Sequence, residues 1–358
     1  MSELDFVVES SAGPYPVNFR CDALSSMANL ERTIIIIDQK VADLYRPIFS
    51  SDLLAARTIT AVAHEETKSL AEMSGFAEQM VACGVRKDDQ LVAIGGGITQ
   101  DIVAFLATIM FRGMEWTFVP TTLVSQADSC IGSKSSINAA GTKNLVGTFR
   151  APGHVTIDTS FLSTLANEQL RSGIGEMLKV HAVSGPLAFD TIAADYPNLL
   201  HDPELMTGAI HRSLLIKRAL VEIDEFDQGP RNVMNYGHSF GHAIEIATEY
   251  RIPHGIAITI GMDMANFTAA RLGISTEEEF QRMHPVLSAN YGGFEDVDIP
   301  AGLLMNALAR DKKNTPTQLR LVMPDKLGAV RLVSVEQTEA ISSAVGAFLD
   351  DVRPFVTP

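Results

Sequence analysis

Short runs of apolar and β-branched residues recur through the first 160 residues, and helical periodicity follows the first three of them. The runs are TIIIID, TITAVA, LVAIGGG, TFVPTT and VTIDT, which begin at residues 33, 58, 91, 117 and 155. Strands buried on both faces form such continuous runs, with helices covering the two faces of a parallel sheet. A hairpin is expected before them, because a Gly-Pro turn separates DFVVES from YPVNFR. Residues 1–160 are therefore predicted to form an α/β domain with a parallel sheet.

Helical periodicity dominates the rest of the chain from about Leu162, and strand signals return only in QLRLVMP and GAVRLV. A chain of 358 residues is long enough for two domains of ordinary size. We predict that residues 161–358 form a second, mostly helical domain. The sequence has no obvious linker, so we expect the domains to pack closely and a ligand to bind in the cleft between them.

Composition excludes several classes of protein. The formal net charge is −15, with 28 Lys and Arg residues against 43 Asp and Glu residues, so a nucleic-acid binder is disfavoured. The longest apolar run, Ile102–Phe111, is far shorter than the roughly 18 residues that span a bilayer. The N-terminus lacks the features of a signal peptide, and the three cysteines are odd in number without a CxxC pair. We expect a cytoplasmic protein with no membrane partner.

Two polar segments of the first domain could bind an anion. IGGGITQD places three glycines between a strand and a helix, where free backbone N–H groups favour a phosphate, although a tight turn would need the same residues. Ser125–Gly147 is expected to be a polar loop, and two lysines with amide partners in one loop suit an anion. A solvated loop without function has the same composition.

Three histidines lie within seventeen residues of the second domain. His238 and His242 are four apart on one helix face, and His254 follows a proline. Glu176 and Lys179 are three apart on another helix, a spacing that by itself is typical of a surface ion pair. Zinc accepts two histidines and a glutamate in catalytic sites, and HxxxH without a central HE pair is not the metalloprotease motif. These residues leave open which two histidines would bind a metal and whether Glu176 is the carboxylate.

A set of motifs resembles the 3-dehydroquinate synthases, a family of sugar phosphate cyclases, from about Asp38 to Asn314. In order they are GGGITQD, FRG, VPTTLVSQADSCIGSK, GTKNLVGTF, RSGIGEMLK, NYGHSFGHAIE, HG and RDKKN. The resemblance implies an N-terminal α/β nucleotide-binding domain and a C-terminal helical domain that binds metal and substrate. It also implies NAD and one divalent metal ion, zinc or cobalt, as cofactors, and a homodimer.

The resemblance assigns roles to single residues. It implies that Glu176, His238 and His254 bind the metal, and that His242, Lys179 and Asn144 are catalytic. NAD is expected on Asp38, Glu65, Lys68, Gly96, Gly97, Asp101, Thr121, Thr122, Lys134, Lys143 and Thr164. Substrate is expected on Arg112, which would reach a phosphate across the dimer interface, and on Asp128, Lys134, Asn144, Lys179, Lys217, Arg231, Asn235, His242 and Lys312 or its neighbour Lys313.

The reaction implied is the conversion of 3-deoxy-arabino-heptulosonate 7-phosphate to 3-dehydroquinate and phosphate, a step toward chorismate. Some residues depart from the family pattern: Gln100, Ser133, Asp227, Pro230 and Ile256. Ile256 stands where a glutamate is frequent, so we expect the metal site to lack a supporting carboxylate there. The alternatives are a sugar phosphate cyclase of secondary metabolism, a metal-dependent polyol dehydrogenase, and a catalytically silent paralogue.

Overall fold

The computed structural model describes residues 2–24, 32–47, 57–311, 314–315 and 317–355, which form two compact units. The first unit contains Met1–Leu165 and Lys217–Asp227, and the second contains Ala166–Ile216 and Gln228–Pro358. Helix α7 (Pro203–Ile223) therefore begins in the second unit and ends in the first. The sequence was expected to divide once, after residue 160. The return of residues 217–227 to the first unit was not predicted. Within the described ranges, no helix has the length and apolar character needed to cross a membrane.

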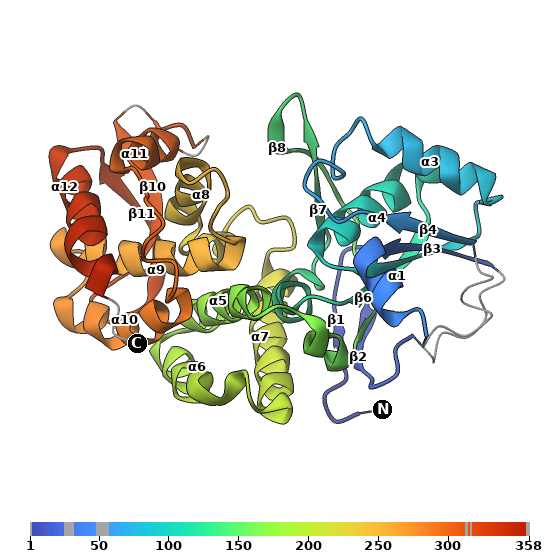
Figure 1. Cartoon of the computed structure of the whole chain (residues 1–358), viewed down its shortest axis with the longest axis horizontal. Coiled ribbons are helices and arrows are strands. Elements are labelled where there is room, and N and C mark those ends of the chain that lie inside the picture. The colour runs from blue at the N-terminus through green and yellow to red at the C-terminus, as the bar shows by residue number, and fades with distance from the viewer. Residues whose placement is uncertain (1, 25–31, 48–56, 312–313, 316, 356–358) are drawn as a thin grey trace. The chain divides into compact units, whose positions relative to one another are not determined.

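The first unit contains a seven-stranded sheet in the order β1-β2-β9-β6-β5-β3-β4 (Figure 1). All neighbouring strands are parallel except the β1–β2 hairpin at one edge, which confirms both the predicted parallel sheet and the predicted opening hairpin. The strands are β1 (Phe6–Val8), β2 (Tyr15–Phe19), β3 (Thr33–Asp38), β4 (Arg57–Ala61), β5 (Gln90–Gly95), β6 (Glu115–Pro120) and β9 (His154–Ile157).

The β-branched run of β3 explains why this sheet is covered on both faces. Every side chain from Thr33 to Ile37 is buried, although successive residues of a strand point to opposite faces. Ile35 and Ile37 pack with Val92, Ile94 and residues of other elements in one apolar cluster. Among the described residues, the α-helices that lie wholly within this unit are α1 (Gln39–Tyr45), α3 (Met73–Ala82) and α4 (Gly97–Ile109).

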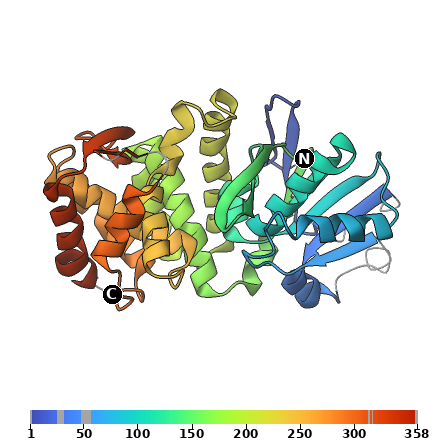
Figure 2. The same cartoon turned by 90° about the horizontal axis from the view of Figure 1, so that it is seen from above.

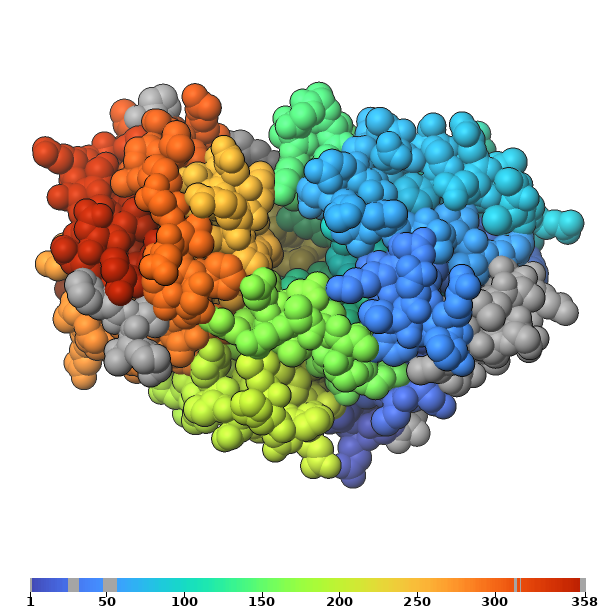
Figure 3. Space-filling model, in the orientation of Figure 1, coloured from blue at the N-terminus to red at the C-terminus, as the bar shows by residue number. Residues whose placement is uncertain are grey.

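The segment expected to be a polar loop is a helical turn followed by a β-hairpin. A π-helical turn, η3, covers Ser125–Ser129, and strands β7 (Lys134–Ala139) and β8 (Thr142–Phe149) pair antiparallel. The hairpin stands out from the body of its unit in Figures 1 and 3, and most side chains of β8 are exposed or partly exposed. An exposed strand has little need of apolar residues, so its composition looked like that of a loop.

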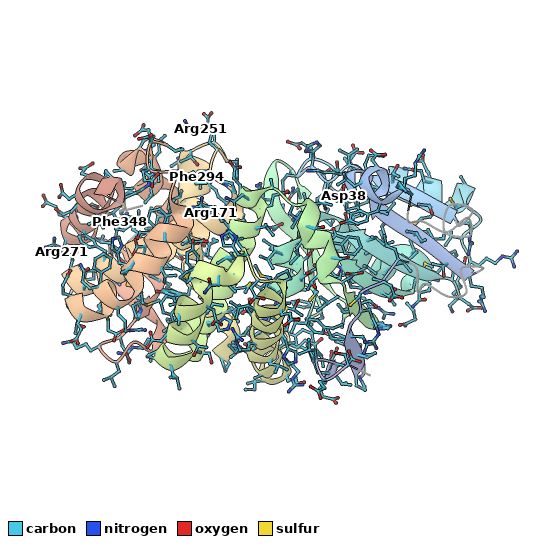
Figure 4. All side chains as sticks on the ribbon, turned by 60° about the horizontal axis from the view of Figure 1, so that its bottom comes forward. Asp38, Arg171, Arg251, Arg271, Phe294 and Phe348 are labelled. Atoms are coloured by element: carbon cyan, nitrogen blue, oxygen red, sulfur yellow. The ribbon has the colours of Figure 1, made fainter. Side chains whose placement is uncertain are left out.

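The second unit is mostly helical, as predicted, and its helices surround α9 (His254–Arg271). Every residue of α9 from Gly255 to Ala269 is buried, and α5, α8 and α10 pack against it (Figures 1 and 2). Arg171 of α5, labelled in Figure 4, donates to carbonyl oxygens at the end of α10. The other elements are α5 (Asn167–Ser184), α6 (Pro186–Leu199), η5 (Pro230–Asn235), α8 (His238–Ala247), α10 (Glu277–Tyr291), α11 (Ala301–Ala309), β10 (Gln318–Pro324), β11 (Val330–Glu336) and α12 (Glu339–Ala347).

Helices α5 and α9 approach so closely that their backbones touch. A Cβ atom at Gly255 would overlap the carbonyl oxygen of Ser172, and one at Gly175 would overlap the carbonyl oxygen of Gly255. The backbone N–H of Gly255 donates to Ser172 Oγ across the same contact, over 2.8 Å. Glycine is therefore required on both helices at this crossing.

Gly255→Ala is expected to lower the free energy of unfolding by about 1–3 kcal/mol, because the added methyl group would force α9 away from α5. Denaturant unfolding measures the change. Gly346→Ala in α12 is the matched control: nothing lies within 4 Å of the position a Cβ would take there, so it should be neutral or stabilising. Equal stability of both variants would contradict the close contact.

Candidate functional site

Glu176, His238 and His254 of the second unit come together although they lie on three helices. Glu176 Oε1 is 3.2 Å from His254 Nε2 and 3.9 Å from His238 Nε2. One ligand atom from each residue lies within 4.8 Å of the others, close enough to hold one metal ion. His238 and His254 are the first residues of α8 and α9, and Glu176 lies one residue after the glycine at the α5–α9 crossing.

Both histidines have their other ring nitrogen next to an oxygen acceptor. His238 Nδ1 lies 3.1 Å from the carbonyl oxygen of Tyr236, and His254 Nδ1 lies 3.2 Å from Glu245 Oε1. An acceptor at Nδ1 places the proton there and directs Nε2 toward Glu176. Metal-binding histidines in proteins are held in this way.

The carboxylate of Glu176 supports the same interpretation. Both of its oxygens are buried, and among the described residues neither accepts a hydrogen bond of good geometry. A buried carboxylate without such donors is costly unless a cation balances it. Lys179 Nζ lies 2.6 Å from Glu176 Oε2, and both side chains are buried, so the expected surface ion pair is in fact a buried one. Glu176 and the two histidine Nε2 atoms thus fit a divalent metal ion.

The pKa values of Glu176, His238 and His254 indicate that a positive charge is favoured beside the Glu176 carboxylate. Burial opposes ionisation of Glu176, but Lys179 and the two histidines outweigh it and hold its pKa well below the ordinary range. Burial lowers the pKa of His238 to about 3, so this histidine is neutral. Partial burial also opposes the charge of His254, yet the carboxylates of Glu176 and Glu245 on either side raise its pKa to about 10. A cation is therefore stabilised between these two carboxylates.

His242 lies beside this cluster on the same helix as His238. Its ring centroid is 5.3 Å from that of His238 and 6.0 Å from that of His254. Together with Glu245 and His254 it forms a second group whose ligand atoms lie within 4.8 Å of one another. Arg231 and Asn235 lie on η5, the turn before α8, and the Arg231 side chain is buried.

In the first unit, candidate nucleotide residues gather at the carboxyl ends of adjacent parallel strands. Asp38 ends β3 (Figure 4), the glycines follow β5, and Thr121 and Thr122 follow β6. The chain runs from β3 outward to β4 and then returns to β5 on the other side of β3. Such a reversal of strand order is where α/β sheets bind ligands. Asp38 also caps α1, accepting from the backbone N–H of Lys40 over 2.8 Å.

The start of α4 fits a phosphate group. Gly96 caps the helix without a side-chain hydrogen bond, and a Cβ atom at Gly97 would meet nothing closer than Ser129 Oγ, 4.0 Å away. The backbone N–H groups of this helix start can therefore be approached by an anion. Gly96 is needed for packing as well, because a Cβ atom there would lie 2.9 Å from Thr122 Cγ2.

A buried lysine joins three segments of the predicted cofactor set. Lys68 Nζ donates to Asp101 Oδ2 over 3.0 Å and to Asn144 Oδ1 over 2.9 Å, and it lies 3.6 Å from Glu65 Oε1. Burial raises the pKa of Asp101, against the effect of Lys68. Thr164 lies apart from this group, with Oγ1 3.2 Å from the hydroxyl of Tyr45.

Two lysines predicted to bind anions are each paired with an acid of the first unit. Lys134 Nζ donates to Asp227 Oδ2 over 2.8 Å. Lys217 Nζ lies 2.5 Å from Asp128 Oδ1 and donates to the Asp128 carbonyl oxygen over 2.6 Å. Both lysines were predicted to bind substrate anions. Their ion pairs with Asp227 and Asp128 were not predicted.

Comparison with known proteins places the chain in a family. The family model of the N-terminal part of 3-dehydroquinate synthase matches residues 58–172, and that of the C-terminal part matches residues 173–314. A 3-dehydroquinate synthase from Paracoccus denitrificans (strain Pd 1222) is 34% identical, over 86% of this chain and 87% of the relative. One from Agrobacterium fabrum (strain C58 / ATCC 33970) is 32% identical, over 96% and 93%. The chain belongs to the 3-dehydroquinate synthase family.

A solved structure with a similar fold is 2-epi-5-epi-valiolone synthase from Streptomyces hygroscopicus subsp. jinggangensis 5008, with NAD+ and Zn2+ bound. It is 26% identical with a TM-score of 0.81, over 94% of this chain and 96% of that one. 2-Deoxy-scyllo-inosose synthase, complexed with carbaglucose-6-phosphate, NAD+ and Co2+, is 23% identical with a TM-score of 0.83, over 95% and 99%, a likeness of fold.

Four further basic residues were predicted from the 3-dehydroquinate synthase motifs. Lys312 lies outside the described residues, as does its neighbour Lys313. Arg112 and Lys143 are exposed, and Arg112 has a left-handed backbone with φ of 64°. Glu245, which contacts His254, was not among the predicted site residues. Glu245 is the last residue of the NYGHSFGHAIE motif. It follows His238 by seven positions, a spacing that places both side chains on the same helix face, and this spacing could have identified it.

Proposed function

We propose that the protein converts 3-deoxy-arabino-heptulosonate 7-phosphate to 3-dehydroquinate and phosphate as a carbon–oxygen lyase. The observation that carries this proposal is that His238 and His254 converge on the buried carboxylate of Glu176 in a chain of this family. When bound, NAD would accept and return a hydride, and zinc or cobalt held by these three residues would act as a Lewis acid.

The chain's own residues would hold and move the protons of the substrate. The Lys179 ammonium is buried against Glu176, so it can orient a substrate oxygen by hydrogen bonding. His242 is exposed beside the two ligand histidines, where an imidazole can exchange protons with substrate. Asn144, already bonded to Lys68, is the third residue that we assign to catalysis.

Charged side chains and one amide at family positions would bind the phosphate and the carboxylate of the substrate. We assign the phosphate to Lys134 and Asn144, and to Arg112 of a second copy in a homodimer. We assign the carboxylate to Lys217 and Arg231. Arginine presents a planar fork that suits a carboxylate. Arg231 stands at one of these family positions and its side chain is buried, so we infer a substrate that carries a carboxylate.

A second candidate is a sugar phosphate cyclase that acts on a substrate without a carboxylate. The observation in its favour is that Asp227 and Pro230 depart from the family pattern beside Arg231, the residue that we assign to the carboxylate. The solved structures of similar fold include 2-deoxy-scyllo-inosose synthase and 2-epi-5-epi-valiolone synthase. We also propose a cytoplasmic location, which is supported by three cysteines that form no disulfide.

The purified protein with NAD+ and a divalent metal is expected to release phosphate from 3-deoxy-arabino-heptulosonate 7-phosphate without accumulating NADH. Phosphate assay, absorbance at the NADH band and product mass measure this outcome. Turnover of sedoheptulose 7-phosphate and no reaction with the heptulosonate would replace the proposal by the second candidate. Net NADH formation would instead indicate a polyol dehydrogenase.

His254→Ala is expected to lose bound metal together with activity while remaining folded, because one of three ligands is removed. His242→Ala is expected to retain metal and lose turnover, since its ring lies beside the ligand set. Metal content after dialysis, measured by atomic emission with circular dichroism as the folding control, separates the two. Full metal content in His254→Ala, or metal loss in His242→Ala, would contradict the assigned roles.

Gly97→Val is expected to weaken NAD binding at least tenfold without unfolding the protein. The side chain would project into the space at the start of α4 that a phosphate would need, and the nearest atom, Ser129 Oγ, is 4.0 Å from the Cβ position. Isothermal titration with NAD+ measures the effect. Gly75→Val is the matched control, because its Cβ position in α3 is also open. Unchanged affinity in Gly97→Val would place the cofactor elsewhere.

A further inference from the structure

Glu245 lies on the face of α8 that also carries the histidines. It follows His242 by three positions and His238 by seven, spacings that bring side chains onto one side of a helix. Glu245 Oε1 lies 3.2 Å from His254 Nδ1, while His254 Nε2 lies 3.2 Å from Glu176 Oε1. The imidazole of His254 is therefore held between two carboxylates, one at each nitrogen.

His254 needs such a contact more than His238 does. The His254 side chain is 42% exposed, against 17% for His238, so packing alone constrains its ring less. The chain's own backbone holds His238, through the carbonyl oxygen of Tyr236 two residues earlier. The Nδ1 atom of His254 instead meets a side chain from another helix, and that side chain is only 13% exposed.

Glu245 could itself be a metal ligand, because it forms a second possible group with His242 and His254. That group would use an oxygen that already faces His254 Nδ1, and it would leave Lys179 as the cation that balances the buried carboxylate of Glu176. The Oε1 atom of Glu176 faces both histidine Nε2 atoms, and its side chain is only 3% exposed, so a cation there stabilises a more deeply buried carboxylate than one at Glu245 would. The geometry thus favours the first group as the metal site, with Glu245 outside it.

We propose that Glu245 is a positioning residue of the metal centre. By accepting a hydrogen bond from His254 Nδ1, it fixes the orientation of the ring and reserves Nε2 for the metal. The proposal rests on the proposed function, because it requires that Glu176, His238 and His254 bind a divalent ion. It also revises the expectation drawn from Ile256: that side chain is buried, and a supporting carboxylate comes from α8.

Metal affinity of the full chain, without substrate or NAD, tests the proposal directly. Zn2+ is titrated against a chelating dye into metal-free wild type, Glu245→Ala, Glu245→Gln and Glu249→Gln. Glu245→Ala should bind Zn2+ about 10–100-fold more weakly, the usual effect of removing the partner of a histidine ligand. Glu245→Gln keeps an acceptor oxygen, so its Zn2+ affinity should fall less than that of Glu245→Ala. Glu249→Gln removes an exposed acid just beyond α8 and should stay within about twofold of wild type.

Cobalt spectroscopy distinguishes a positioning residue from a ligand. At saturating Co2+, Glu245→Ala should keep the intensity of the wild-type visible bands, because the three ligands and their number are unchanged. If Glu245 were a ligand, these bands would change. The Zn2+ affinity of Glu245→Gln would then fall as far as that of Glu245→Ala, and both affinities would equal that of His254→Ala. That outcome would overturn the positioning role and leave a metal site in place.

Two further outcomes would also overturn the proposal. Wild-type Zn2+ affinity in Glu245→Ala would show that the hydrogen bond does not support the site, while the proposed function would stand. A wild-type chain that binds neither Zn2+ nor Co2+ would remove the metal centre and the proposed function with it. Thermal unfolding of each metal-free variant shows whether the chain is folded before metal is added.

Discussion

The backbone contact between α5 and α9 is the constraint on which the candidate metal centre depends. Side chains larger than hydrogen do not fit at Gly175 or Gly255, because each would overlap a backbone oxygen of the other helix. The same contact brings Glu176 and His254 together, since each is adjacent in sequence to one of these glycines. Helix packing and ligand geometry are thus determined by the same residues.

A second glycine contact completes the arrangement. A Cβ atom at Gly261 of α9 would overlap the carbonyl oxygen of Gly237, and Gly237 itself has φ of +73°. His238 follows Gly237 and begins α8. The third proposed ligand is therefore positioned by α9 as well, and the buried charge of Glu176 is balanced by Lys179 and by whatever cation the two histidines help to hold.

The parts of the structure that the sequence predicted are those with one dominant physical signal. Continuous β-branched runs such as TIIIID predicted the parallel sheet, because only strands buried on both faces need them. The β7–β8 hairpin was missed, because exposed strands resemble loops in composition. The burial of Glu176 and Lys179 could not be predicted either, since a spacing of three fits a surface helix equally well. The contacts of Glu245 with His254 and of Asp227 with Lys134 join residues 9 and 93 positions apart, and their register depends on tertiary packing.

The central claim is that three helices bring two imidazole Nε2 atoms and one buried carboxylate to a single metal ion. Anomalous diffraction from crystals of the protein grown with Zn2+ or Co2+ measures this most directly. The account predicts one strong peak, bonded to Glu176, His238 Nε2 and His254 Nε2 at about 2.0–2.2 Å. A peak bonded to His242 and Glu245, or no peak at these residues in crystals that contain the metal, would contradict it.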